Sequence, residues 1–361
     1  MLPFIRSRRP LGPVVISAGL AVAAVFAGGV ARHASAAPHG SARVLGRQGS
    51  VTAGPASATA RSSTHATFVG GTYATANGAS VTVRVSAAFP DGSDRGQRWA
   101  EFFSTMPHGD ELSTVTVTVV TGAELPASCH SDALGCYGPG EIVFADEIIG
   151  GITPEEVARH EYGHHVAASR LNAPWPALDW GPKRWATAAH VCGDVTAGSA
   201  HPGDEGDNYA ENPAEAWAEV YRILAERTAG SPGNTWSIVA GHYFPDDAVL
   251  AAAREDVVHP WTTPTTRRLS GMFTKRGKPQ WQRILATPLD GNITIKLSMP
   301  AGRRHDVTLL AANGRTVLAH WTAFTTKTRT IATTICGQRS VVLRVTRGNA
   351  PGPFSVVVTS A

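Results

Sequence analysis

The segment TPEEVARHEYGHHVAASR, residues 153–170, is the feature that most restricts how this chain can fold. Thr153 suits a helix N-cap, a proline follows in the first turn, and Glu156 stands three residues after the cap, so a capping box is predicted. A helix therefore begins at a defined place. His160 and His164 are four residues apart, so they lie on one face of that helix, one turn apart.

Two imidazoles at this spacing can direct their nitrogen atoms to one metal ion about 2.0–2.1 Å away, the usual zinc–nitrogen distance. Glu161 is rotated about 100° from His160, so it borders the same site without binding the metal. A base for a metal-bound water is expected there. Gly163 costs about 1 kcal/mol of helix stability relative to alanine, and a close backbone contact or the passage of substrate would explain it. A surface helix with solvated histidines and glutamates is the alternative interpretation.

A metal site with two histidines needs a third protein ligand and an open position for water. A histidine six residues after His164 would complete one arrangement, but that position is Arg170. A carboxylate on a later helix is the other solution, and ENPAEAWAEVYR offers Glu215 and Glu219 on one helix face. Glu211 is interpreted as a charge in the cap region of that helix. For Glu219, an ordinary solvated glutamate is the alternative.

HEYGHH and a glutamate helix some fifty residues later resemble the gluzincin group of zinc metallopeptidases. YAENPAEAWAE is more similar to the lethal-factor-like branch of that group than to thermolysin. The resemblance covers roughly residues 100–260 and implies roles for individual residues. These are zinc ligation by His160, His164 and Glu215, general-base catalysis by Glu161, and acceptance by Glu219 of a hydrogen bond from a ligating histidine.

The same resemblance implies two further features of the site. Tyr209, just before the ligand helix, would stabilise the oxyanion, with Tyr221, Tyr243 and His242 as alternatives. EIVFAD, residues 141–146, takes the position of the sheet-edge strand that pairs with an extended substrate. A plain core strand is the other interpretation of this segment.

The chain divides by composition into four parts. Residues 1–36 combine a basic start, an apolar stretch and ASA, which predicts a cleaved signal peptide and leaves a retained membrane anchor as the alternative. Residues 37–66 are mostly Ala, Ser, Gly, Thr and Pro, which predicts a flexible leader or linker. Strand and helix patterns over 67–262 fit a zincin-like metallopeptidase domain. Short β-rich runs over 265–361, with an Asn-Gly turn, predict a β-sandwich module.

The predicted fold class is therefore α+β, with a zincin-like metallopeptidase domain followed by a small all-β sandwich domain. The β-sandwich loosely resembles modules appended to secreted bacterial peptidases. Export permits disulfides, and Cys129 and Cys136 close a short loop, so they are the first expected pair. Cys192 with Cys336 follows by elimination.

The predicted function is that of a secreted, monomeric endopeptidase that cleaves peptide or protein substrates with one Zn²⁺ ion, zinc-activated water and Glu161 as general base. One alternative is a catalytically silent zinc-site protein whose β-module binds a cell surface or cell wall, and another is a metal hydrolase acting on a non-peptide amide. The net charge is +4, and four arginines of residues 1–36 account for it. No nucleic-acid partner is therefore inferred.

Overall fold

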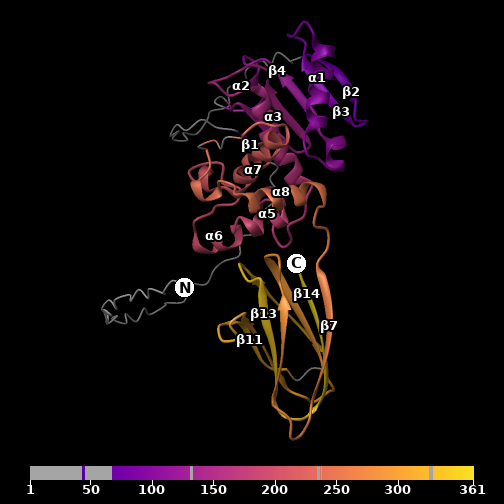
Figure 1. Ribbon diagram of the computed structural model, residues 1–361, viewed down its shortest axis with the longest axis vertical. Helices are drawn as coiled ribbons and strands as arrows, with labels where there is room; N and C mark the ends of the chain where they lie inside the picture. The colour runs from indigo at the N-terminus through magenta and orange to yellow at the C-terminus, as the bar shows by residue number, and fades with distance from the viewer. Residues whose placement is uncertain (1–42, 45–66, 131–132, 234–235, 237, 325–327) are drawn as a thin grey trace, which may run out of the picture. The chain divides into compact units, whose positions relative to one another are not determined.

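The computed structural model describes residues 43–44, 67–130, 133–233, 236, 238–324 and 328–361 (Figure 1). The chain is of mixed α and β class. The predicted signal peptide lies outside the described residues, as does all of the predicted leader except Arg43–Val44. Within the described ranges, no helix is long and apolar enough to cross a membrane. The domain boundaries expected from the sequence stay a prediction.

A six-stranded mixed sheet carries the first part of the fold, in the order β1-β5-β6-β4-β3-β2. Strands β3, β4 and β6 run parallel to one another, and the other pairings are antiparallel. In β3 alternate valines are fully buried, as a half-buried strand requires. The strands are β1 (Arg43–Val44), β2 (Phe68–Ala74), β3 (Ser80–Ser86), β4 (Thr116–Val120), β5 (Gly135–Gly138) and β6 (Glu141–Ala145).

The expectation that EIVFAD forms the edge strand is wrong. These residues form β6, whose backbone pairs with β4 on one side and with β5 on the other. Both rows of its backbone groups are therefore occupied, and four of its five residues are buried. The short strand β5 lies outside β6, nearer the edge of the sheet.

Helices pack on this sheet around one large apolar cluster that contains Trp99, Phe144, Tyr162, Trp185 and Trp217. The stretch between α3 and α7 contains three short α-helices, α4 to α6. The α-helices are α1 (Gly92–Thr105), α2 (Leu125–Ser128), α3 (Pro154–Ala168), α4 (Ala177–Trp180), α5 (Lys183–Ala188), α6 (Val191–Ala197), α7 (Pro213–Thr228) and α8 (Asp247–Val258). The 3₁₀ helices are η1 (Asp110–Thr114), η2 (Tyr209–Glu211) and η3 (Gly241–Tyr243).

Two antiparallel four-stranded sheets form a sandwich in the second part of the fold, in the orders β11-β10-β13-β8 and β12-β9-β14-β7. Alternate apolar residues of both sheets form a second, separate core. The Asn-Gly turn joins β10 and β11 as a hairpin, as predicted. The strands are β7 (Thr265–Phe273), β8 (Gln280–Ala286), β9 (Gly291–Ser298), β10 (His305–Ala311), β11 (Val317–Phe324), β12 (Thr328–Ile335), β13 (Ser340–Arg347) and β14 (Gly352–Ser360).

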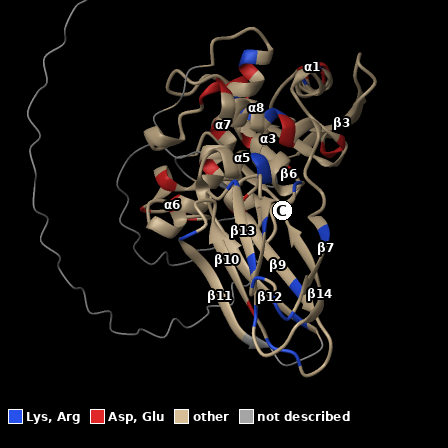
Figure 2. Cartoon of the chain, turned by 60° about the horizontal axis from the view of Figure 1, so that its bottom comes forward, with Lys and Arg blue, Asp and Glu red and all other residues tan. Residues whose placement is uncertain are grey.

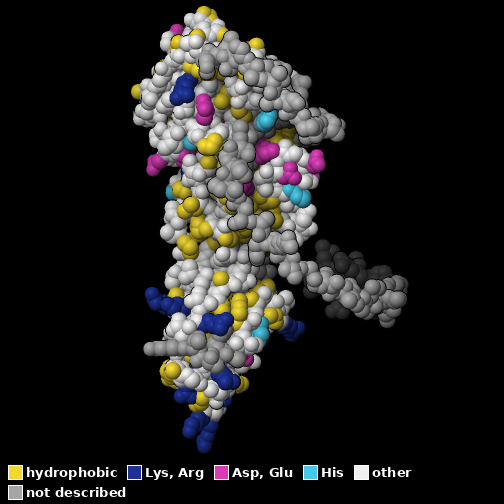
Figure 3. All heavy atoms as spheres, turned by 180° about the vertical axis from the view of Figure 1, so that it is seen from behind, with side chains coloured by type: hydrophobic (Ala, Val, Ile, Leu, Met, Phe, Trp, Pro, Cys, Tyr) yellow, Lys and Arg dark blue, Asp and Glu magenta, His cyan; other side chains and the backbone are white. Residues whose placement is uncertain are grey.

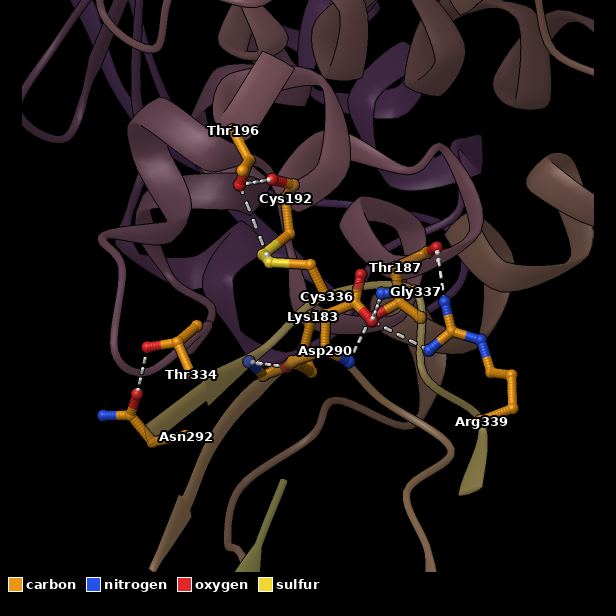
Figure 4. Close-up of a disulfide and its surroundings, with 10 residues drawn as sticks. All are labelled: Lys183, Thr187, Cys192, Thr196, Asp290, Asn292, Thr334, Cys336, Gly337 and Arg339. Carbon is orange, nitrogen blue, oxygen red and sulfur yellow. Dashed lines mark hydrogen bonds and ion pairs between the residues drawn. A yellow bond between two sulfur atoms is a disulfide. The ribbon is translucent and has the colours of Figure 1, made fainter. Parts of the chain in front are cut away.

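The chain contains the disulfides Cys129–Cys136 and Cys192–Cys336. The second joins α6 to the segment between β12 and β13 (Figure 4). Such crosslinks are typical of proteins in an oxidising, extracellular environment.

Several polar contacts surround the second disulfide. Lys183 Nζ donates to the carbonyls of Ala173 at 2.7 Å and Asp290 at 2.9 Å. Arg339 donates to the Asp290 carboxylate at 2.9 Å and to the Thr187 carbonyl at 3.3 Å (Figure 4). The helical part and the sandwich are therefore joined by a covalent bond and by several hydrogen bonds.

Candidate metal centre

Helix α3 begins with the predicted capping box. The Thr153 side chain accepts a hydrogen bond from the Glu156 backbone N–H at 3.3 Å, and the Glu156 carboxylate accepts one from the Thr153 backbone N–H at 2.9 Å. The helix is not on the surface, because its middle and last turns are almost wholly buried. The alternative interpretation of a solvated surface helix is therefore wrong.

Helix α7 packs against α3, and Gly163 is the point of closest approach. A Cβ atom at this glycine would lie 2.9 Å from Ala218 Cα and 3.1 Å from Tyr221 Cβ. The Trp217 indole N–H donates to the Gly163 carbonyl at 2.7 Å across the same contact. A close backbone contact therefore explains the glycine, and the helix axes can approach because this side chain is absent.

This packing brings His160, His164 and Glu215 together. His160 Nε2 lies 3.2 Å from Glu215 Oε2, and His164 Nε2 lies 3.4 Å from Glu215 Oε1. One ligand atom from each residue falls within 4.8 Å of the others. All three side chains are at most 1% exposed. The geometry fits a three-residue metal site in the interior.

The separations agree with the demands of a tetrahedral ion. Two ligand atoms that each lie about 2.0–2.1 Å from a tetrahedral centre are about 3.3–3.4 Å apart. The distances of 3.2 Å from His160 Nε2 to Glu215 Oε2 and of 3.4 Å from His164 Nε2 to Glu215 Oε1 are close to this separation, and each histidine faces a different oxygen of the carboxylate. Two imidazoles and one carboxylate are also a donor set that suits zinc. The residues present therefore fit a zinc ion.

The pKa values of His160 and Glu215 show that the two side chains attract each other. Burial alone lowers the pKa of His160, but the carboxylates of Glu215 and Glu219 raise it to about 9. Burial alone raises the pKa of Glu215, but the imidazoles of His164 and His160 hold it well below its usual range. Without a metal ion, the protonated imidazole of His160 therefore stabilises the buried carboxylate.

Glu161 lies beside this group, on the next position of α3, and is fully buried. Its negative charge contributes to the raised pKa values of His160 and Tyr209, so it lies within electrostatic reach of both. A Cβ atom placed on Gly135 of β5 would lie 3.2 Å from Glu161 Cγ. Strand β5, which neighbours the edge strand β1, therefore borders the carboxylate that was predicted to be the base.

Tyr209 contacts the ligand set from η2. Its hydroxyl donates to Glu215 Oε2 at 2.6 Å, and burial with the nearby Glu215 charge raises its pKa well above the usual value. The alternative Tyr221 donates instead to the Pro107 carbonyl at 2.6 Å. Tyr243 packs in the core against Trp185.

Glu219 is buried, so the interpretation as a solvated glutamate is wrong. Its Oε2 lies 3.9 Å from His160 Nδ1, which is an ionic distance and longer than a hydrogen bond. Its hydrogen bonds come from Arg222 and Trp236. Arg222 Nε and Nη2 donate to the two carboxylate oxygens at 2.8 and 2.7 Å, and the Trp236 backbone N–H donates at 2.6 Å.

Arg222 and Trp236 are functional candidates that the sequence did not reveal. The Trp236 ring stacks on the His160 imidazole, with centroids 5.7 Å apart and planes 21° apart. Arg222 Cζ lies 4.2 Å from the centre of the same indole. Arg222 stands three residues after Glu219 on one helix, a spacing that could have indicated the pair. Trp236 lies in an irregular segment, where no periodic pattern marks it.

No family model matches this sequence, and no curated protein matches it either. Solved structures give only distant likenesses. A metallopeptidase in complex with T-antigen is 11% identical over 69% of this chain and 38% of that chain, with a TM-score of 0.18. The pre-peptidase C-terminal domain of a collagenase from Bacillus anthracis is 15% identical, covering 27% of this chain and 89% of that domain, with a TM-score of 0.21.

A family 35 carbohydrate binding module from Clostridium thermocellum is 14% identical, covering 28% of this chain and 100% of that module, with a TM-score of 0.19. TM-scores this low assign neither a fold nor a function. The candidate site therefore depends on its own geometry.

We expect zinc to displace a proton when it binds the metal-free protein at neutral pH. Because the pKa of His160 is about 9 without metal, its imidazole carries a proton that must leave before the nitrogen can bind zinc. Zinc affinity should rise about tenfold per pH unit below about pH 9 and then level off. Titration calorimetry in two buffers of different ionisation enthalpy measures the released proton. An affinity that stays constant between about pH 7 and 9 would contradict this expectation.

Replacing Arg222 with methionine should weaken zinc binding by about 10–100-fold, because Glu219 then loses the group that fixes it toward His160. Competition with a chromophoric chelator measures this affinity without any assay of hydrolysis. Arg170→Met is the matched control, because it breaks another buried ion pair, with Glu111 at 2.8 Å. It should lower folding stability but leave zinc affinity within about twofold. Equal losses of affinity in both variants would assign Arg222 a general structural role only.

Proposed function

We propose that this chain is a secreted zinc metallopeptidase of the gluzincin type that hydrolyses internal peptide bonds. The observation that carries the proposal is the convergence of His160, His164 and Glu215 on one buried point with Glu161 beside it. Two histidines and a carboxylate leave one position of a tetrahedral ion open, as in catalytic rather than structural zinc sites.

Each residue of the site has a proposed task. His160, His164 and Glu215 would hold the ion, which when bound supplies Lewis-acid chemistry that polarises a carbonyl and acidifies water. Glu161 takes a proton from the attacking water and passes it to the leaving amine. The Tyr209 hydroxyl, which donates to Glu215 Oε2 in this structure, would change partner and donate its hydrogen bond to the oxyanion that develops on the carbonyl oxygen.

A peptide substrate is favoured by strand β5, which lies next to Glu161 and accepts an extended segment on its outer side. The outer edge of β5 pairs with an extended segment, because β1 lies antiparallel to it with Arg43 opposite Tyr137 and Val44 opposite Cys136. The Tyr137 ring also stacks near His164, with centroids 6.3 Å apart. An extended peptide that took the place of β1 would use the same backbone groups of β5 beside the site, which a substrate without a peptide backbone could not use.

Glu161→Gln should abolish peptide hydrolysis while zinc stays bound, because the amide keeps the shape of the side chain but cannot accept the proton. Turnover of a quenched-fluorescent peptide library and metal content by mass spectrometry are measured on the same sample. A chelator should abolish the activity of the unmodified protein in parallel. Full hydrolysis by the variant would refute the assigned base, and an inactive unmodified protein that holds zinc would favour a silent binding protein.

Tyr209→Phe should lower kcat by about 10²–10³-fold with little change in zinc affinity, because the oxyanion loses one donor. Loss of zinc affinity with kcat of the loaded enzyme preserved would instead show that the hydroxyl only orients Glu215. Tyr243→Phe is the matched control and removes another buried tyrosine hydroxyl. It should leave both quantities unchanged, and a loss of kcat confined to this control would transfer the role away from Tyr209.

A further inference from the structure

Charge is separated strongly along the chain. Residues 265–361 contain 15 Lys and Arg but only two acidic residues, whereas residues 37–264 contain 13 Lys and Arg and 26 Asp and Glu. The sandwich therefore carries a net charge of +13 and the preceding part −13. The near-neutral sum conceals this separation. Red acidic segments gather around the helices in Figure 2, and blue segments mark the strands and loops of the sandwich.

Five cations gather at one end of the sandwich, which we call the basic loop end: Lys275, Arg276, Lys278, Arg303 and Arg304. They lie in the β7–β8 and β9–β10 connections, and Arg303 alone is half-buried while the others are exposed. Among the ion pairs of the described residues, none involves any of the five. Like charges in such number repel one another, so this end of the sandwich gains stability when an anion neutralises them.

Backbone contacts tie these connections to the turn between β13 and β14. The Gly348 N–H donates to the Arg304 carbonyl at 2.9 Å, and the Arg304 N–H donates to Asn349 Oδ1 at 2.8 Å. The Arg347 guanidinium donates to the Thr274 carbonyl. The cations therefore stand on connections that are linked to one another, as a fixed binding surface requires.

The sheet β12-β9-β14-β7 adds rows of hydroxyl groups on its outer face, which we call the hydroxyl face. One row across the four strands is Ser270, Ser355, Ser298 and Thr328. The adjacent row is Arg268, Val357, Lys296 and Thr330. Residues in direct register share one face of a sheet, so two exposed cations lie beside a row of hydroxyls.

We propose that the sandwich binds a linear anionic polysaccharide through the basic loop end and the hydroxyl face. The cations form ion pairs with the acidic groups of the polymer, and the serine and threonine hydroxyls form hydrogen bonds with its sugar hydroxyls. On the face drawn in Figure 3, Lys and Arg side chains gather over the sandwich with little acidic surface among them. This inference does not depend on the proposed metal chemistry.

Two other polyanions fit the surface less well. Single-stranded nucleic acid binds through bases stacked on exposed aromatic rings, but Phe273, Phe354 and His305 near this end are buried in the core. A surface that binds an anionic membrane also carries apolar side chains at its loop tips, which insert between the lipids. The described tip residues 274–279 and 300–304 contain no large apolar side chain.

The test measures binding of the full chain to fluorescein-labelled heparin, a sulfated polysaccharide, from about 50 to 200 mM salt. Affinity should fall steeply with salt. The triple variant Lys275→Glu, Arg276→Glu, Lys278→Glu should bind at least about tenfold more weakly and with a shallower salt dependence. The matched control is Arg84→Glu, Arg227→Glu, Arg254→Glu, which changes the same number of exposed cations outside the sandwich. It should stay within about twofold of the unmodified protein.

Further ligands separate a polysaccharide from other polyanions. Neutral dextran should not bind, and oligothymidine and phosphatidylglycerol vesicles should bind more weakly than heparin. Ser270→Ala with Ser355→Ala should weaken heparin binding several-fold but weaken the binding of inorganic polyphosphate less, because polyphosphate offers no sugar hydroxyls to the serines. The proposal is overturned if heparin does not bind, if the control variant loses as much affinity as the triple variant, or if DNA or vesicles bind at least as tightly. Circular dichroism verifies that each variant is folded.

Discussion

The interior carboxylate of Glu215, held against two imidazoles, is the interaction on which the helical part of this protein depends. A buried ionised carboxylate is costly unless positive charge faces it, and here His160 and His164 stand 3.2 and 3.4 Å from its two oxygens. Those distances exist only because α3 and α7 approach closely at Gly163. Helix packing and site chemistry are therefore one constraint: a side chain at this glycine would separate the helices and the ligands together.

The charged groups behind the site extend this constraint away from the ligands. The Glu219 carboxylate faces His160 on one side, and on the other it accepts two hydrogen bonds from the Arg222 guanidinium. Arg222 also donates to Glu226 at 2.6 Å and lies over the Trp236 indole. A planar guanidinium suits this position because it satisfies two carboxylates and an aromatic face at once. Glu219 therefore lies between the His160 imidazole and the Arg222 guanidinium.

Local sequence signals predicted the parts of this fold that local physics decides. Thr153 and Glu156 define the start of α3, and the Asn-Gly pair defines the β10–β11 hairpin, because caps and tight turns depend on a few neighbouring residues. Sheet order was not predictable in this way, since β6 became an interior strand through pairing with distant β4. For the site, helix spacing predicted that His160 and His164 share one face of a helix, and the resemblance to gluzincins implied Glu215 as the third ligand. The contacts of Trp236 come from tertiary packing, and no periodic pattern in the sequence indicates them.

The covalent link between α6 and the sandwich affects how such a protein would tolerate proteases outside the cell. Residues 259–264 connect α8 to β7 without regular structure, and a segment of this kind is a preferred place for cleavage. A cut there would break the polypeptide but would not release the sandwich, because the Cys192–Cys336 bond spans 144 residues across that connection. The cleaved molecule would stay in one piece until the Cys192–Cys336 bond was reduced. Separation of the two parts would therefore need reduction of the disulfide as well as proteolysis.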